Sequence, residues 1–198
     1  MNRELLKKNF ENHGFETSFF DTKEEAAAYL AGRLEGKKIS VGGSMTVKEM
    51  GLDKLLAEKN EVIWHWITPG RETLLKAREA EIYLTSANGV SETGELVNID
   101  GNGNRAAQTL FGPEKTYFLV GKNKITEDLA GAMDRAKNIA SPKNALRLQV
   151  KTPCVANGGD RCYDCSSPER ICHSTVILER PSKGMEVEVI FNDEELGF

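Results

Sequence analysis

The sequence predicts an α/β fold in which a mostly parallel sheet is flanked by helices. Short apolar segments of strand character alternate with segments of helical periodicity, and such alternation is typical of parallel strands joined by right-handed crossovers. The segment 116–120, TYFLV, is a continuous apolar run, as expected for a strand in the interior of a parallel sheet. The strand expected at 39–41 leads through two glycines into a helix start, a common join in α/β chains.

The first half of the chain carries the clearest start and stop signals. A short leading helix is expected over 3–15, where apolar residues recur near helical spacing. Thr22 and Glu25 match a capping box that begins a second helix, and Gly36 ends it. Strands are then expected at 39–41, 62–64 and 82–85, with helical segments between them.

The second half continues the alternation and then changes character. Its expected elements are a helix at 104–110, the strand at 116–120, a helix over 126–140 that ends at Ser141-Pro142, and strands at 175–178 and 186–191. No internal repeat, low-complexity tract or linker divides the chain. We therefore expect one domain over 1–198, with 151–174 as a long cysteine-rich loop.

The composition is that of an ordinary globular protein. Of the 198 residues, 39% are hydrophobic and 28% are charged. A formal net charge of −4 and a pI near 5.6 argue against nucleic acid or an anionic membrane as the main partner. The N-terminus lacks the apolar region of a signal peptide, and no window approaches the roughly 20 apolar residues that span a bilayer. We expect a cytoplasmic protein without nucleic-acid or membrane partners, for which a homo-oligomer is allowed.

The segment 83–105, YLTSANGVSETGELVNIDGNGNR, is the strongest candidate for a binding loop. Glycines let the backbone approach a ligand closely, while hydroxyls, amides and an arginine supply hydrogen-bond donors. The same composition is typical of ordinary turns, so that interpretation stays open. The ligand-binding candidates in this segment are Thr85, Ser86, Asn88, Thr93, Gly94, Gly101, Asn104 and Arg105.

Three residues of the segment 83–105 are also suited to catalysis. Arg105 could clamp a carboxylate or phosphate, and Glu92 or Asp100 could act as a general base or accept a hydroxyl hydrogen bond. Turn and cap roles for the two acids are the alternative. The candidate catalytic residues are therefore Glu92, Asp100 and Arg105.

A second binding wall is expected where the strand at 39–41 meets a helix start. The candidates there are Gly42, Gly43, Ser44 and Thr46. Free backbone N–H groups and the positive end of a helix together favour an anion, although a plain strand-to-helix turn explains the same residues. The pattern is not a P-loop, because Gly-x-x-x-x-Gly-Lys-Ser/Thr is absent, and the chain contains no motif for a nucleotide cofactor.

All four cysteines fall within one short segment near the C-terminus, with the spacing Cys154-x7-Cys162-x2-Cys165-x6-Cys172. A Cys-x2-Cys pair can place two thiolates on one metal, and two more cysteines complete a four-sulfur site for zinc or an iron–sulfur cluster. The spacing does not name the metal. A redox or free-thiol loop, or one or two local disulfides, is the alternative.

The histidines and tryptophans give weaker signals. His13 and His65 lack partners in the sequence and are expected to be surface or packing residues. Trp64 and Trp66 have strand spacing, which places both rings on one face and is more typical of a core than of a cofactor site.

Three blocks, in this order, resemble the lactate-utilization (LUD) domain family: GGSMT with KE at 42–49, TSANGVSETG at 85–94 and DGNGNR at 100–105. The order of the blocks is more specific than any one of them, and the resemblance covers essentially the whole chain. Stand-alone bacterial members with a cysteine-rich C-terminal segment look most similar.

The resemblance implies a fold like that of the glucosamine-phosphate deaminase, ribose-phosphate isomerase and CoA-transferase group. In that group, loops at strand ends bind small anionic or phosphorylated ligands. It also implies a link to lactate or organic-acid utilization, alongside iron–sulfur redox proteins as partners. The function expected is a pocket for a small anionic ligand at the carboxyl ends of the strands. The alternative is an accessory subunit that carries zinc or an iron–sulfur cluster and has no catalysis of its own.

Overall fold

The computed structural model describes all 198 residues and confirms the α/β class with a mostly parallel central sheet. All five strand pairings in the main sheet are parallel. The strand order is β1 (Glu16–Phe20), β10 (Glu186–Asn192), β7 (Lys115–Gly121), β4 (Ile82–Thr85), β2 (Lys38–Val41) and β3 (Glu61–Trp64).

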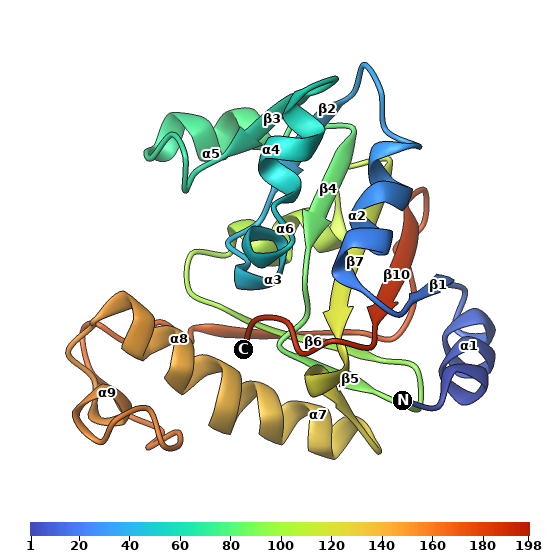
Figure 1. Ribbon diagram of the computed structural model, residues 1–198. Helices are drawn as coiled ribbons and strands as arrows, with labels where there is room; N and C mark the ends of the chain where they lie inside the picture. Colours follow the sequence, from blue (N-terminus) through green and yellow to red (C-terminus); the bar gives the residue numbers. More distant parts are fainter.

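A second, four-stranded sheet lies below the carboxyl ends of β4, β7 and β10 (Figure 1). It is mixed: β5 pairs with β8 in parallel, whereas β6 is antiparallel to both β5 and β9. The chain passes from β4 into β5 and from β7 through a short 3-10 turn into β8. The order in this sheet is β8 (Ile125–Thr126), β5 (Gly89–Ser91), β6 (Leu96–Asp100) and β9 (Ser174–Leu178).

Helices such as α2 and α4 pack beside the main sheet, and α7 and α8 form the lowest layer in the view of Figure 1. Those in the first half are α1 (Arg3–Asn12), α2 (Lys23–Ala31), α3 (Met45–Glu49), α4 (Leu52–Ala57) and α5 (Arg71–Ala77). Those in the second half are α6 (Asn104–Leu110), the 3-10 turn η1 (Lys122–Lys124), α7 (Leu129–Arg135), the π turn η2 (Ala136–Ala140), α8 (Ser141–Leu148) and α9 (Pro153–Ala156). None of the helices is both long enough and apolar enough to cross a membrane.

The position of β7 inside the main sheet explains why its sequence is continuously apolar rather than alternating. Tyr117 and Leu119 point into a core cluster built with α2 and α4, whereas Phe118 and Val120 point into a cluster built with α1 and the second sheet. Both faces of the strand are therefore buried. Fully burying side chains of this size stabilises the fold by about 1.5–3 kcal/mol each.

Two expected boundaries were wrong. The leading helix ends at Asn12, and the strand β1 follows it, although 16–20 carried no strand prediction. The helix expected to stop at Ser141-Pro142 instead continues through the π turn into α8 (Figure 1). Pro142 lies in the first turn of α8, directly after the π turn, where its missing N–H and its ring are accommodated.

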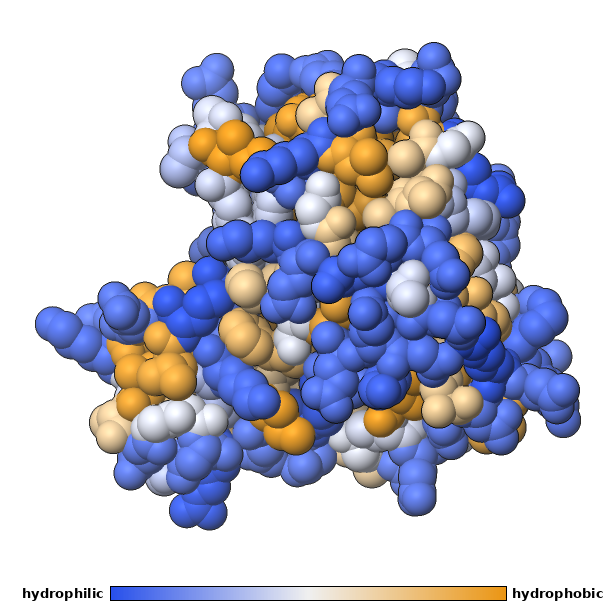
Figure 2. All heavy atoms as spheres, viewed as in Figure 1, coloured by the Kyte–Doolittle hydropathy of each residue, from blue (hydrophilic) through white to orange (hydrophobic).

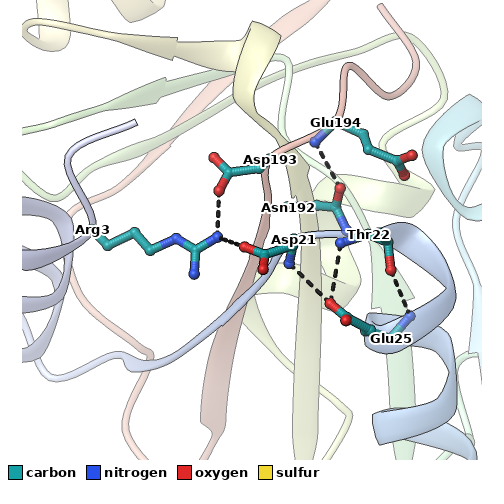
Figure 3. Close-up of polar contacts among 7 residues, drawn as sticks. All are labelled: Arg3, Asp21, Thr22, Glu25, Asn192, Asp193 and Glu194. Atoms are coloured by element: carbon teal, nitrogen blue, oxygen red, sulfur yellow. Dashed lines mark hydrogen bonds and ion pairs between the residues drawn. The ribbon is translucent and has the colours of Figure 1, made fainter.

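The predicted capping box at Thr22 and Glu25 is confirmed, and it lies beside a contact between distant parts of the chain (Figure 3). Glu25 N donates to Thr22 Oγ1 at 3.3 Å, and the Glu25 carboxylate accepts from Thr22 N at 3.3 Å. Next to it, the Arg3 guanidinium bonds both Asp21 and Asp193. The arginine thereby ties α1 to the ends of β1 and β10.

We predict that Gly89→Ala lowers the free energy of unfolding by about 3 kcal/mol, the upper end of the range for overpacking. A Cβ at Gly89 would overlap the backbone carbonyl of Ala132 in α7, and neither backbone can yield locally. Urea denaturation in the presence of a thiol reductant measures the change.

The matched control is Gly32→Ala at the end of α2. There an added Cβ would meet its nearest neighbour, Ala28 O, at 3.4 Å, and the backbone is already right-handed. We expect this change to be neutral or stabilising by up to about 1 kcal/mol. Equal effects of the two substitutions would contradict the close approach of α7 and β5.

Candidate functional site

A cavity at one end of the main sheet, here called the cleft, has a volume of about 250 Å³. Its walls come from the loops that follow β2, β3 and β4, from the region around the start of α6, from α8 and from the cysteine-rich loop. Figure 2 shows the surface hollowed between the upper part that carries α5 and the lower part that carries α8 and α9. The cleft thus lies at the carboxyl ends of parallel strands, where open α/β sheets bind ligands.

The cleft brings together many of the predicted site residues from distant parts of the sequence. Those that line it are Gly43, Ser44, Ser86, Asn88, Asp100, Gly101, Asn104 and Arg105. Gly42, Thr46 and Thr85 are buried behind this surface, where Thr46 Oγ1 donates to Leu196 O at 3.2 Å.

Glu92, Thr93 and Gly94 lie elsewhere, in the turn between β5 and β6. Asn9 of α1 donates its side-chain N–H to Glu92 O at 2.6 Å, and Gly94 packs against the backbone of Asn9 and the ring of His13. These three residues are not part of the cleft wall. The structure therefore places them in a contact between α1 and the second sheet.

The turn that follows β2 supplies backbone to the cleft but offers little as an open helix end. The helix α3 has only five residues, and Ser44 Oγ already accepts a hydrogen bond from Val47 N at 3.2 Å. A short helix whose cap is already satisfied gives an anion weak support. Side chains rather than this helix end supply the positive charge of the cleft.

Asp100 has a structural role as a cap. Its Oδ2 accepts a hydrogen bond from Ala106 N at 2.9 Å, in the first turn of α6, and the side chain is buried. The helix has no side-chain cap from Gly103, the residue that precedes it. Asp100 thus satisfies a free N–H group at the start of α6, which is the alternative role expected for it.

Lys124 is a site residue that sequence reasoning missed. It is fully buried at the end of η1 and lines the cleft. Its Nζ donates to Ser86 Oγ at 2.9 Å and to Ala87 O at 3.2 Å. Burial, together with the nearby charges of Arg135 and Arg105, lowers the pKa of Lys124 to about 7, and the carboxylate of Glu49 opposes this shift. Its position just after the carboxyl end of β7 was a signal that could have identified it.

Two more arginines lie near the cleft without a carboxylate partner: Arg135 is buried, whereas Arg147 is exposed. Arg135 donates Nε to Asn123 O at 2.8 Å and bonds the carbonyl of Asn88, and burial lowers its pKa to about 10. Arg147 stacks over the Trp66 ring at 4.6 Å from the centroid. Burial, together with the charge of Arg105, lowers the pKa of Arg147. Positive charge is therefore concentrated here at an electrostatic cost.

His65 and Trp66 also lie in the cleft wall, so the surface-or-packing role expected for His65 understated its position. Burial lowers the pKa of His65; the charge of Arg105 acts in the same direction and Asp100 opposes it. Trp64 and Trp66 stack with their centroids 5.2 Å apart, on one face as expected. Trp64 is part of the core, whereas Trp66 is exposed to the cleft.

The four cysteines line a second, smaller cavity of about 20 Å³, here called the cysteine cavity. All four are half-buried free thiols. Burial raises the pKa of Cys172, which the adjacent Arg170 guanidinium opposes. No three His, Cys, Asp or Glu side chains stand at the spacing that one metal ion needs. Ser141, Arg170 and Ile171 line both cavities, so the two share a wall.

Comparison with known proteins agrees with this architecture. The chain is similar to a crystal structure of a DUF162 family protein from Deinococcus radiodurans, with 13% sequence identity, a TM-score of 0.53, and coverage of 96% of this chain and 94% of that one. No curated protein matches the sequence. The family model described as the LUD domain matches residues 3–191. The chain therefore belongs to the LUD-domain family.

Proposed function

We propose that the cleft binds a small organic anion, either a carboxylic acid or a phosphorylated compound, in a role related to lactate utilization. Membership of the LUD-domain family supports the link to lactate utilization. The observation that carries the binding proposal is the charge of the cleft. Arg105, Lys124, Arg147 and Arg170 line it, and Asp100 is the one acidic side chain among the lining residues.

Arg105 is the centre of this charge. Its guanidinium acts on His65, Lys124 and Arg147, and in each case it lowers the pKa, which means that it opposes a second positive charge. An anion placed among these groups would act in the opposite direction and raise the pKa of each of them. Such a ligand would therefore interact favourably with several positively charged side chains at once.

The size and lining of the cleft narrow the class of ligand. A volume of about 250 Å³ lies just below the usual range for drug-sized ligands, so it fits a small acid or a sugar phosphate. The ring of Trp66 offers an apolar surface, and Ser86 and Asn88 offer polar groups. Lys124 supplies a largely neutral amine that can take up a proton when an anion arrives.

We predict that Arg105→Gln weakens binding of such an anion about 10- to 100-fold, because a charge-assisted hydrogen bond contributes about 1.5–3 kcal/mol. Titration calorimetry with lactate, pyruvate, inorganic phosphate, sugar phosphates and CoA esters identifies the ligand and measures the loss. Arg71→Gln, on the exposed start of α5, changes the net charge equally and should leave the affinity unchanged. If none of these compounds binds to the unaltered protein, the proposal is refuted.

Binding is also expected to depend on pH through Lys124. With a pKa of about 7 in the free protein, the amine is mostly neutral at pH 8, and a bound anion raises its pKa. Binding at pH 8 therefore takes up a proton, and the affinity falls as the pH rises above about 7.

Calorimetry at pH 8 in two buffers of different ionization enthalpy measures this proton uptake. Lys124→Met should abolish it. An identical uptake in the variant would show that another group carries the proton.

The protonation of Lys124 can be tested without a ligand. Between pH 7 and pH 10.5, the ordinary value for lysine, the unfolded chain binds one more proton than the folded chain. The free energy of unfolding should therefore rise with pH over this window, by a few kcal/mol at most. Denaturation of Lys124→Met at the same pH values should lack this rise, and an equal rise in both proteins would exclude a neutral buried amine.

A further inference from the structure

We propose that Cys154, Cys162, Cys165 and Cys172 hold a thiolate-ligated metal centre, zinc or an iron–sulfur cluster, in the cysteine cavity. Both kinds of centre take four cysteine ligands. The chain has four cysteines in all, and each of them lines the same cavity, although they come from α9 and from three separate points of the loop that follows it. Chance placement of four thiols along a loop does not by itself bring them to a common space.

The loop that carries the cysteines has little else to hold it together. Over 151–173 it contains only the single helical turn of α9, and Thr152 is its only buried residue. Polar contacts join its ends, including Lys151 N to Glu169 Oε2 at 2.7 Å and Ser167 Oγ to Lys151 O at 2.8 Å. Segments that lack an apolar core of their own are commonly stabilised by a structural metal or by disulfides.

Groups around the thiols match those that support metal-bound cysteines. Asp164 N donates to Cys162 Sγ at 3.3 Å, and Thr152 Oγ1 lies 3.1 Å from Cys154 Sγ. Arg170 donates Nη1 to the carbonyl of Cys165 at 2.5 Å and Nε to that of Cys172 at 2.7 Å. Hydrogen bonds of this kind orient ligands and tune the centre.

The charge around the cavity fits a negative centre. A divalent ion with four thiolates carries two negative charges, and Lys137 and Arg170 line the cavity. Asp164 lies near both cations, with its Oδ1 at 3.7 Å from Lys137 Nζ and 3.6 Å from Arg170 Nη2. Asp164 is exposed, so its carboxylate offsets these charges only in part.

The side chains must turn toward the cavity for the centre to form, since no three of them stand at the spacing for one ion. Rotation about χ1 moves a cysteine Sγ among three positions. Pro142, Ala145 and Ile171 give the cavity apolar walls, against which metal-bound thiolates are more stable than free thiolates, because the ion offsets part of their charge.

Metal analysis of the full chain, purified without oxygen and without added metal, tests the proposal. We expect either about one zinc ion per chain in a colourless protein, or iron and acid-labile sulfide in equal amounts with broad visible absorbance. Either result supports the centre and identifies it. Metal-free protein with four titratable thiols, or with disulfides, would overturn it.

Cys162→Ser and Cys172→Ser should each lose most of the bound metal. Ser166→Ala, which alters an exposed neighbour of Cys165, should retain it. Retention of metal by both cysteine variants would also refute the proposal.

If the cysteine variants fail to fold, cobalt titration of the metal-depleted wild-type chain provides an independent measurement. Thiolate-to-cobalt charge transfer that saturates near one ion per chain, with the visible bands of a tetrahedral ion, is expected. Absence of thiolate charge transfer would overturn the assignment.

Discussion

The parallel pairing of β4 with β7 is the constraint on which the rest of the structure depends. Both strands end at the same edge of the main sheet. The segments that follow them then cross into the second sheet, where β5 and β8 pair in parallel again. Ser86 Oγ donates to Leu119 O at 2.6 Å and accepts from Lys124 Nζ, so it joins the two crossings. The buried amine is therefore part of the connection between the sheets, and the cleft opens beside it.

The crossing also explains why positive charge is tolerated in a buried place. Lys124, Arg105 and Arg135 bond backbone carbonyls exposed where strands end or bend, which gives each of them a structural partner without a carboxylate. On the opposite wall, the cysteine-rich loop approaches so closely that a Cβ at Gly101 would lie 2.5 Å from Ile171 O. Arg170 and Ile171 consequently line both cavities, and a movement of the loop would change the wall of the cleft.

Sequence reasoning succeeded where local patterns carry the information. The buried run of β7, the capping box at Thr22 and the family blocks predicted the fold class. Of the residues from 100 to 105 that were expected in a pocket, Asp100, Gly101, Asn104 and Arg105 line the cleft. It failed where position depends on pairing between distant strands. Arg147 shows no local signal, because its stacking on Trp66 arises only in the folded chain. The position of Lys124 after β7 was visible in the sequence, but the burial of its amine against the residues that follow β4 was not. The strand β1 was missed because it lies at the sheet edge and is only partly buried.

The π turn between α7 and α8 has a consequence for how the cleft can vary. Ala132 and Ala136 before or within it pack on the second sheet, whereas Asn144 and Arg147 after it face the cleft. Removing one residue from the turn would rotate α8 by about 100° relative to α7 and carry both polar side chains away from the cleft. The lining of this wall therefore depends on the number of residues in the turn, and deleting one of them would change which side chains face the cleft without substituting any other residue.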